Sequence, residues 1–196
     1  LRKMAAGGIY DHLGGGFHRY SVDGQWLIPH FEKMLYDNAQ LVRIYLDGWR
    51  LTKEARFRQV VEETLEWTRR ELAHADGAFF AAQDADSEGE EGRFFVWNQA
   101  EILAVLGQEL GEMFCRAYGV TDGGNFEGKT VLNRLGDVGS SAEAQEQLEA
   151  TLRPARKKLL AAREQRVKPQ RDENILTSWN ALAVSAFLDA YQTFGT

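Results

Sequence analysis

The stretch GGGFHRYSVDGQWLIPHFEKMLYDN, residues 14–38, governs the interpretation of the whole chain. Three glycines lead into an alternating segment, which then runs into a helix-forming sequence. A connection between two helices normally needs only a few residues, whereas this one is long and crowded with ionisable and aromatic side chains. We therefore expect the loop to present functional groups, in addition to reversing the chain.

Several side chains of this loop are candidates for a functional site. The candidate catalytic residues are His18, His30 and Glu32, and the candidate substrate-binding residues are Arg19, Trp26 and Asp37. Histidines and carboxylates gathered in one loop favour acid–base chemistry. A structural alternative stays open, because Glu32 stands where a helix begins and can interact with the helix N-terminus. A single histidine is also more often a structural hydrogen-bonding residue than a catalyst.

The composition of the 196 residues is that of an ordinary globular domain, with 44% hydrophobic residues and a net charge of −6. The negative charge argues against nucleic acid as a partner, because phosphate binding requires a basic face. No apolar run is long enough to span a membrane, and no signal peptide is recognisable. The single cysteine, Cys115, excludes an internal disulfide and fits a buried thiol in a reducing, cytoplasmic location.

Apolar residues recur at helical spacing along most of the chain, which predicts a mainly α fold. The expected helices cover residues 1–13, 31–51, about 55–72, 98–118 with a break at Gly107–Gly111, 141–166, and about 175–191. Two short strands are expected at Phe79–Phe80 and Phe94–Trp97, and an irregular insertion at residues 124–132. The sequence thus predicts helices with short β-hairpin insertions in their loops.

The order of these elements is repetitive: a helix, a decorated loop, a second helix and a short return. That order is typical of stacked helical hairpins. Because consecutive antiparallel helices alternate in direction, the loops at residues 14–30, 77–97 and 167–174 should emerge at the same end. We therefore expect these three loops to face one shared cleft.

The second loop carries the acidic segment Asp84-Ala-Asp86-Ser-Glu88-Gly89. It resembles the start of an EF-hand calcium loop, but Phe95 occupies the twelfth position, where a bidentate glutamate is needed. Two interpretations remain open. The carboxylates form a solvated hairpin tip, or the neighbouring aromatic strand holds them over a pocket, where like charges would raise a pKa. In the second case Asp84 and Asp86 are catalytic candidates, and Glu88 and Trp97 bind substrate.

The third loop and the last helix supply the remaining candidates for substrate binding, which are Asp172, Trp179 and Asn180. Asp172 can equally be a helix cap, and Trp179 lies on the apolar stripe of its helix, which favours core packing. No paired Cys/His spacing, phosphate-binding loop or nucleophile elbow is present. We therefore expect no metal and no cofactor.

Four segments together carry a resemblance to a known family. They are GGIYDHLGGGFHRYSVDGQWLIPHFEKMLYDNAQL (7–41), QDADSEGEEGRFFVW (83–97), GNFEGKTVL (124–132) and DENILTSWNAL (172–182). In this order they resemble the YyaL-type thioredoxin-domain proteins, which are related to a spermatogenesis-associated protein. The motifs are long and distinctive, and they span nearly the whole chain.

The resemblance implies a fold and a partner. In this family a thioredoxin-like domain precedes an (α/α)6 toroid of the six-hairpin glycosidase and N-acylglucosamine 2-epimerase type. The present chain resembles only the first part of the toroid, so residues 1–196 would form a single partial domain. Its implied partner is the thioredoxin-like domain of the same full-length chain. Neither catalytic motif of the related toroids maps onto this sequence, so no catalytic residue is carried over.

Two functional hypotheses follow, and the sequence leaves open whether the protein is an enzyme. The first is a domain that binds or processes a small carbohydrate in the loop-lined acidic cleft. A glycoside hydrolase would use Asp84 or Asp86 as the acid and Glu32 as a second carboxylate, with Trp26 or Trp97 stacked on the sugar. A sugar epimerase would instead use His18 or His30 to remove a proton.

The second hypothesis is a non-catalytic helical scaffold that supports the upstream thioredoxin-like domain or binds another protein. It predicts an exposed apolar patch away from the three loops. It also predicts that Asp84→Asn and His30→Ala leave function unchanged.

Overall fold

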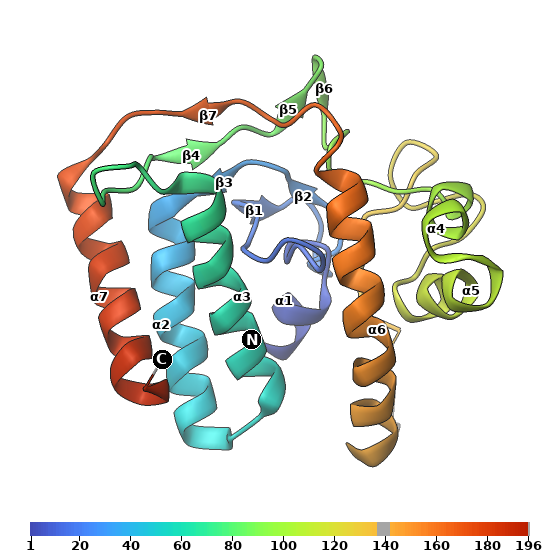
Figure 1. The fold of residues 1–196 in the computed structure, drawn as a ribbon, viewed down its shortest axis with the longest axis horizontal. Coiled ribbons are helices and arrows are strands. Elements are labelled where there is room, and N and C mark those ends of the chain that lie inside the picture. Colours follow the sequence, from blue (N-terminus) through green and yellow to red (C-terminus); the bar gives the residue numbers. More distant parts are fainter. Residues whose placement is uncertain (137–141, 196) are drawn as a thin grey trace.

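The computed structural model describes residues 1–136 and 142–195 (Figure 1). Its helices are α1 (Arg2–Ala6), α2 (Leu35–Thr52), α3 (Ala55–Leu72), α4 (Gln99–Leu106), α5 (Gln108–Ala117), α6 (Ala142–Arg163) and α7 (Thr177–Phe194). The predicted mainly α fold is confirmed. No helix within the described ranges is long and apolar enough to cross a membrane.

Short strands occupy the loops between these helices. They are β1 (Tyr20–Ser21), β2 (Pro29–His30), β3 (Lys33–Met34), β4 (Ala82–Gln83), β5 (Asp86–Ser87), β6 (Glu90–Glu91) and β7 (Arg171–Asp172). Strands β1 and β2 form one antiparallel hairpin and β5 and β6 another, while β3, β4 and β7 form a three-stranded antiparallel sheet with β4 in the centre.

The three-stranded sheet joins the loops that the sequence analysis places at one end of the helices. Lys33 lies opposite Gln83 in its register, and Gln83 lies opposite Arg171. The loops therefore meet, with β4 and β7 running together over the ends of α2 and α3 (Figure 1). They meet edge to edge as paired strands.

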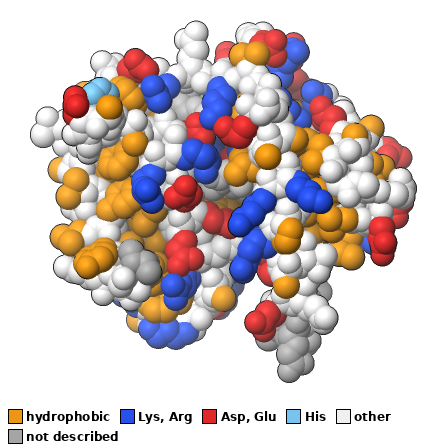
Figure 2. Space-filling view, in the orientation of Figure 1, with side chains coloured by type: hydrophobic (Ala, Val, Ile, Leu, Met, Phe, Trp, Pro, Cys, Tyr) orange, Lys and Arg blue, Asp and Glu red, His pale blue; other side chains and the backbone are white. Residues whose placement is uncertain are grey.

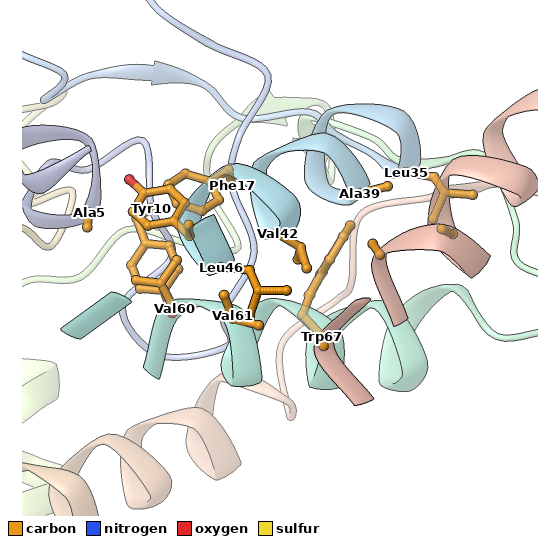
Figure 3. Packing of buried hydrophobic residues seen from close by; sticks show 14 of the residues in the cluster. Ala5, Tyr10, Phe17, Leu35, Ala39, Val42, Leu46, Val60, Val61 and Trp67 are labelled. Atoms are coloured by element: carbon orange, nitrogen blue, oxygen red, sulfur yellow. The ribbon is translucent and has the colours of Figure 1, made fainter. Parts of the chain in front are cut away.

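The main core forms where α2 packs against both α3 and α7. Aromatic and aliphatic side chains from all three helices interlock there with residues of the N-terminal segment (Figure 3). Trp67 of α3 and Tyr45 of α2 are almost completely buried, and Ala183, Ala186 and Ala190 bring α7 close. Each large apolar side chain that is buried in this way contributes about 1.5–3 kcal/mol to folding.

A second core lies between α4, α5 and α6. The Asn98 side chain accepts a hydrogen bond from Glu101 N, and Glu101 Oε2 accepts one from Asn98 N, so α4 begins with a capping box. The predicted break falls at Gly107, where α4 ends and α5 begins.

The predicted helix over residues 1–13 is wrong beyond Ala6. The chain turns at Gly7 and Gly8 because it passes directly under the backbone of residues 26–27. A Cβ at Gly8 would collide with the carbonyl oxygen of Leu27, and Ile9 N donates to Trp26 O at 3.1 Å. A crossing this close needs glycine and cannot be accommodated by a continuing helix.

Three other predicted boundaries differ from the structure. The helix expected from residue 31 begins at Leu35, because Lys33 and Met34 pair with β4. The strands expected at residues 79–80 and 94–97 are not formed, since Phe94 and Phe95 are buried in turns and the hairpin closes nearer the tip. The helix expected over residues 141–166 ends at Arg163, and residue 141 lies outside the described residues.

Candidate functional site

One group of polar side chains from the first two loops lies on the surface around His30. We call Arg19, His30, Glu32 and Glu91 the loop cluster. The His30 ring donates from Nδ1 to Glu91 Oε1 at 2.7 Å, and its Nε2 lies 3.7 Å from Glu32 Oε2. Arg19 Nη1 donates to the same Glu32 oxygen at 2.9 Å. The acidic hairpin and the first loop are thus brought into contact.

Strand pairing positions this cluster. The β1–β2 register sets Tyr20 opposite His30, and the two rings stack with centroids 5.0 Å apart. Glu91 Oε1 also accepts from Phe31 N at 3.2 Å, which fixes the carboxylate between the two loops. Three of the predicted residues, Arg19, His30 and Glu32, therefore lie together at the surface.

Asp37 stands beside this cluster in the first turn of α2. Its carboxyl oxygen Oδ2 is buried and has no hydrogen-bond partner in the part of the chain that is described. Burial raises the pKa of Asp37 and is opposed by the positive charge of Arg19 and a hydrogen bond from the Tyr36 side chain, while the negative charge of Glu32 adds to the rise. The neighbouring Tyr36 packs against Trp179 of α7, with ring centroids 4.7 Å apart. A half-buried carboxyl of this kind is suited to donate a proton.

His18, by contrast, lies in the core and not in the loop cluster. It is 2% exposed, and its ring nitrogen Nδ1 contacts Phe31 O at 2.8 Å while the ring packs against Phe31 and Phe95. Burial, together with the positive charge of Lys33, lowers its pKa to about 3. The imidazole is therefore neutral near pH 7 and closed off from a substrate.

The acidic segment of the second loop points into solvent. Asp84 and Asp86 are exposed, and Asp84 Oδ1 accepts a hydrogen bond from Ala85 N at 2.6 Å. Glu88 is also exposed and pairs with Arg93 at 3.1 Å. The contacts of these three residues are those of a solvated hairpin tip.

Two of the tryptophans predicted to bind substrate differ in their surroundings. Trp97 is 2% exposed and lies beneath the guanidinium of Arg166, 4.1 Å from the ring centroid. Trp26 is 36% exposed, and its backbone takes part in the close crossing with the N-terminal segment.

The candidates of the third loop and α7 make local contacts. Asp172 is exposed in β7 and accepts hydrogen bonds from Asn174. Asn180 accepts a hydrogen bond from Phe79 N and donates one to Phe79 O, at 2.8 and 2.9 Å, so its amide joins α7 to the second loop. These contacts are structural.

A buried charge cluster was missed by the sequence analysis. Asp11 accepts hydrogen bonds from Lys33 Nζ at 2.7 Å and from both terminal nitrogens of Arg163 at 2.9 and 2.8 Å. Lys33 is fully buried and also donates to Gly15 O at 2.8 Å. Burial lowers the pKa of Lys33 to about 8, although the Asp11 carboxylate opposes the shift. A side chain at Gly14 would collide with Arg163 and Asp11, which explains one glycine of the opening stretch.

Strand alternation offered a signal for this cluster. In an extended segment, residues two apart point to the same face. Phe31 and Lys33 are both completely buried, whereas Glu32 between them points outward to the loop cluster. The predicted helix from residue 31 does not contain this alternation, because residues two apart on a helix do not share a face.

Two cavities lie on the surface of α3, and neither is lined by a predicted site residue. One, of about 470 Å³, lies between the end of α3, the following turn and α7. The other, of about 310 Å³, lies between α3 and α6. Among the described residues, no three His, Cys, Asp or Glu side chains are grouped as metal ligands would be.

Known proteins provide an independent comparison. The chain is similar to spermatogenesis-associated protein 20. It is 36% identical to the human protein in an alignment of 219 positions that covers 95% of this chain and 28% of the human protein. The rat protein is 36% identical in an alignment of 227 positions, and an uncharacterised Caenorhabditis elegans protein is 37% identical in an alignment of 221 positions.

The chain spans less than a third of the length of these relatives, with 28% of the rat and 30% of the nematode protein covered. No protein-family profile matches the sequence. The sequence predicts a relationship to a spermatogenesis-associated protein, and this similarity confirms it. The relatives are larger proteins, which leaves room for additional domains.

Proposed function

We propose that the loop cluster and Asp37 form part of a site that binds a small carbohydrate. The observation that carries this proposal is the buried Oδ2 of Asp37, which has no hydrogen-bond partner among the described residues and lies beside Arg19 and Glu32. Small-molecule sites combine a few converging polar groups with aromatic surface, which Tyr36 and Trp179 supply here.

The proposal includes the larger architecture that the family resemblance implies. In an (α/α)6 toroid of the six-hairpin type, this chain would contribute the first part, and residues from the rest of the ring would complete the site. The edge-to-edge meeting of the three loops supports a site at that end of the helices.

The surroundings of each group suggest how roles would be divided. In a hydrolase, Asp37 would donate a proton to the leaving group and Glu32 would act as the second carboxylate. In an epimerase, His30 would exchange the proton, since its ring is partly accessible and lies between Glu32 and Glu91. The exposed Asp84 and Asp86 lack the desolvated surroundings that favour a general acid.

A thermal-shift screen of the full-length protein, which contains the complete toroid of the proposal, against mono- and disaccharides and their phosphates tests the proposal. A sugar that binds the native state raises the melting temperature by mass action. We expect a shift with at least one sugar, which disappears in Asp37→Asn and in Glu32→Gln. Asp47→Asn, an exposed change further along α2, is the matched control and should keep the shift. No shift with any sugar, or one that all three variants retain, would refute the carbohydrate site.

A second function, the helical scaffold, is favoured by a separate observation. Large apolar side chains of α7 and α2 are exposed to solvent, namely Val184, Leu188 and Tyr191 of α7 and Ile44 and Leu51 of α2. Figure 2 shows hydrophobic side chains gathered over α7. Such a surface is suited to contact the thioredoxin-like domain or another protein.

A binding measurement with the thioredoxin-like domain tests the scaffold. We expect Leu188→Lys to weaken association at least about tenfold, because it places a charge in an apolar contact. Asp84→Asn and His30→Ala should leave association unchanged. Association that is insensitive to Leu188→Lys would argue against this surface.

A further inference from the structure

The groove between α3 and α6 has walls of opposite charge. Its cavity of about 310 Å³ has a floor of Leu13 and Gly14. The α3 wall carries Glu62, Glu63 and Glu66, and the α6 wall carries Arg153, Arg156 and Lys157. Arg70 of α3 also lines the groove, but its guanidinium pairs with Glu71 and donates to Gly14 O. In Figure 2, acidic side chains on the α3 side face basic ones on the α6 side across a hollow.

The two walls barely pair with each other. Among the described residues, the one ion pair between the walls joins Arg156 Nη2 to Glu63 Oε1 at 3.8 Å, which is too long for a hydrogen bond. Glu62 and Glu66 pair along their own helix, with Arg58 and Arg69.

The basic wall keeps charge available for a ligand. Within the described ranges, neither Arg153 nor Lys157 forms an ion pair, and both are exposed. Arg153 and Lys157 therefore face the glutamates of α3 across the groove without an ion pair to them in the described part of the chain.

The best-positioned group of each wall is held in place by other contacts. Arg156 is 6% exposed, and its Nη1 donates to Tyr118 Oη at 3.0 Å and to Glu149 Oε2 at 2.8 Å. These bonds fix the guanidinium and leave Nη2 directed at the groove. Glu63 in turn accepts hydrogen bonds from Tyr10 and Gln59. Because both groups are fixed, the gap between them does not close by simple rotation of a side chain.

We propose that this groove binds a small zwitterion, with a carboxylate at one end and an ammonium group at the other. The carboxylate would be bound by Arg156, Arg153 and Lys157, and the ammonium by Glu62, Glu63 and Glu66. A ligand with only one charge would leave the charges of the opposite wall desolvated and unpaired. The groove should therefore bind the zwitterion more tightly than a carboxylate or an amine alone.

Isothermal titration calorimetry with a matched series of probes tests this preference. The probes are straight-chain ω-amino acids from glycine to 6-aminohexanoate, and for each length the carboxylate and the amine alone. We expect saturable binding of at least one ω-amino acid, at least about tenfold tighter than the carboxylate or amine of equal length. Absence of saturable binding at every length would overturn the proposal, as would equal binding of a single-charge probe.

Exposed residues provide variants that should not disturb folding. Lys157→Gln and Glu66→Gln each remove one charge from opposite walls, and each should weaken the best probe by about tenfold. Lys158→Gln, an exposed neutralisation at the adjacent position of α6 that does not line the groove, should have no effect. Binding that survives both wall variants would place the probe elsewhere and refute the assignment. None of these residues belongs to the loop cluster, so the outcome is independent of the carbohydrate proposal.

Discussion

At the scale of single residues, the ammonium group of Lys33 is enclosed by Asp11, Gly15 O and the rings of Trp67 and Phe95. Removing one partner of a buried ion pair leaves a charge that is only partly compensated. We expect Lys33→Met to lower the free energy of unfolding by about 3 kcal/mol or more, as measured by chemical denaturation.

The matched comparison for Lys33→Met is Arg69→Met, which breaks an exposed ion pair with Glu66. Its expected cost is below about 1 kcal/mol. Similar costs for the two substitutions would show that the buried cluster contributes no more than a surface pair does.

The buried histidines His12 and His18 predict a dependence of stability on pH. Burial lowers the pKa of each to about 3 from an ordinary value of 6.5. Between these values the unfolded chain binds a proton that the folded protein excludes, so the free energy of unfolding falls as the pH falls below 6.5. We expect a loss of about 1–2 kcal/mol per histidine between pH 7 and pH 5.

Urea denaturation at several pH values measures this dependence. His18→Gln should reduce the slope of stability against pH by about half, since His12 supplies the other half. A slope that His18→Gln does not alter would show that His18 is protonated in the folded protein.

At the scale of elements, the end of α1 is set by the crossing of two backbones. Gly8→Ala should be strongly destabilising, by about 2 kcal/mol or more, because its Cβ would collide with Leu27 O and with Val131. Gly24 lies in the loop that contains residues 26–27, and a Cβ added there would have no atom within 4 Å. Gly24→Ala should therefore change stability by less than about 1 kcal/mol. Equal melting temperatures for the two variants would contradict the crossing.

Local patterns in the sequence were sufficient to predict the long helices. The apolar spacing of α2, α3 and α7 and the break at Gly107 were predicted. The predictions failed where distant segments determine local structure. Gly7 and Gly8 follow a helical residue, but the backbone of residues 26–27 prevents the helix from continuing. Phe94 and Phe95 were predicted to lie in a strand. In the structure they lie in turns, because their side chains pack into a buried cluster with Phe31.

The candidate site was accessible from the sequence only in part. Arg19, His30 and Glu32 were recognisable because they are ionisable residues in one long loop, and the structure places them together. The burial of His18 depends on Phe95 and Phe31, which no local pattern reveals. The charge cluster around Asp11 was not predicted, because Arg163, which binds Asp11, lies 152 residues away in the sequence.

At the scale of the whole molecule, the core of α4, α5 and α6 is tied to the N-terminal loops by the bidentate pair between Arg163 and Asp11. We expect Arg163→Met to speed amide hydrogen exchange in α6 and α4, while α2 and α7 remain protected, because their packing lies in the other core. Lys158→Met, an exposed change on the same helix, is the control. Equal acceleration in all helices would show that the two cores open as one unit.

The main core contains both Ala5 and Ala190, and the central sheet pairs residues 33–34, 82–83 and 171–172. During translation, the N-terminal segments must therefore wait for α7 before their apolar surface is covered. At ordinary elongation rates that wait lasts on the order of ten seconds or more. Throughout this interval the nascent chain exposes an unfinished hydrophobic surface, which is the kind of state that chaperones bind and from which aggregation begins.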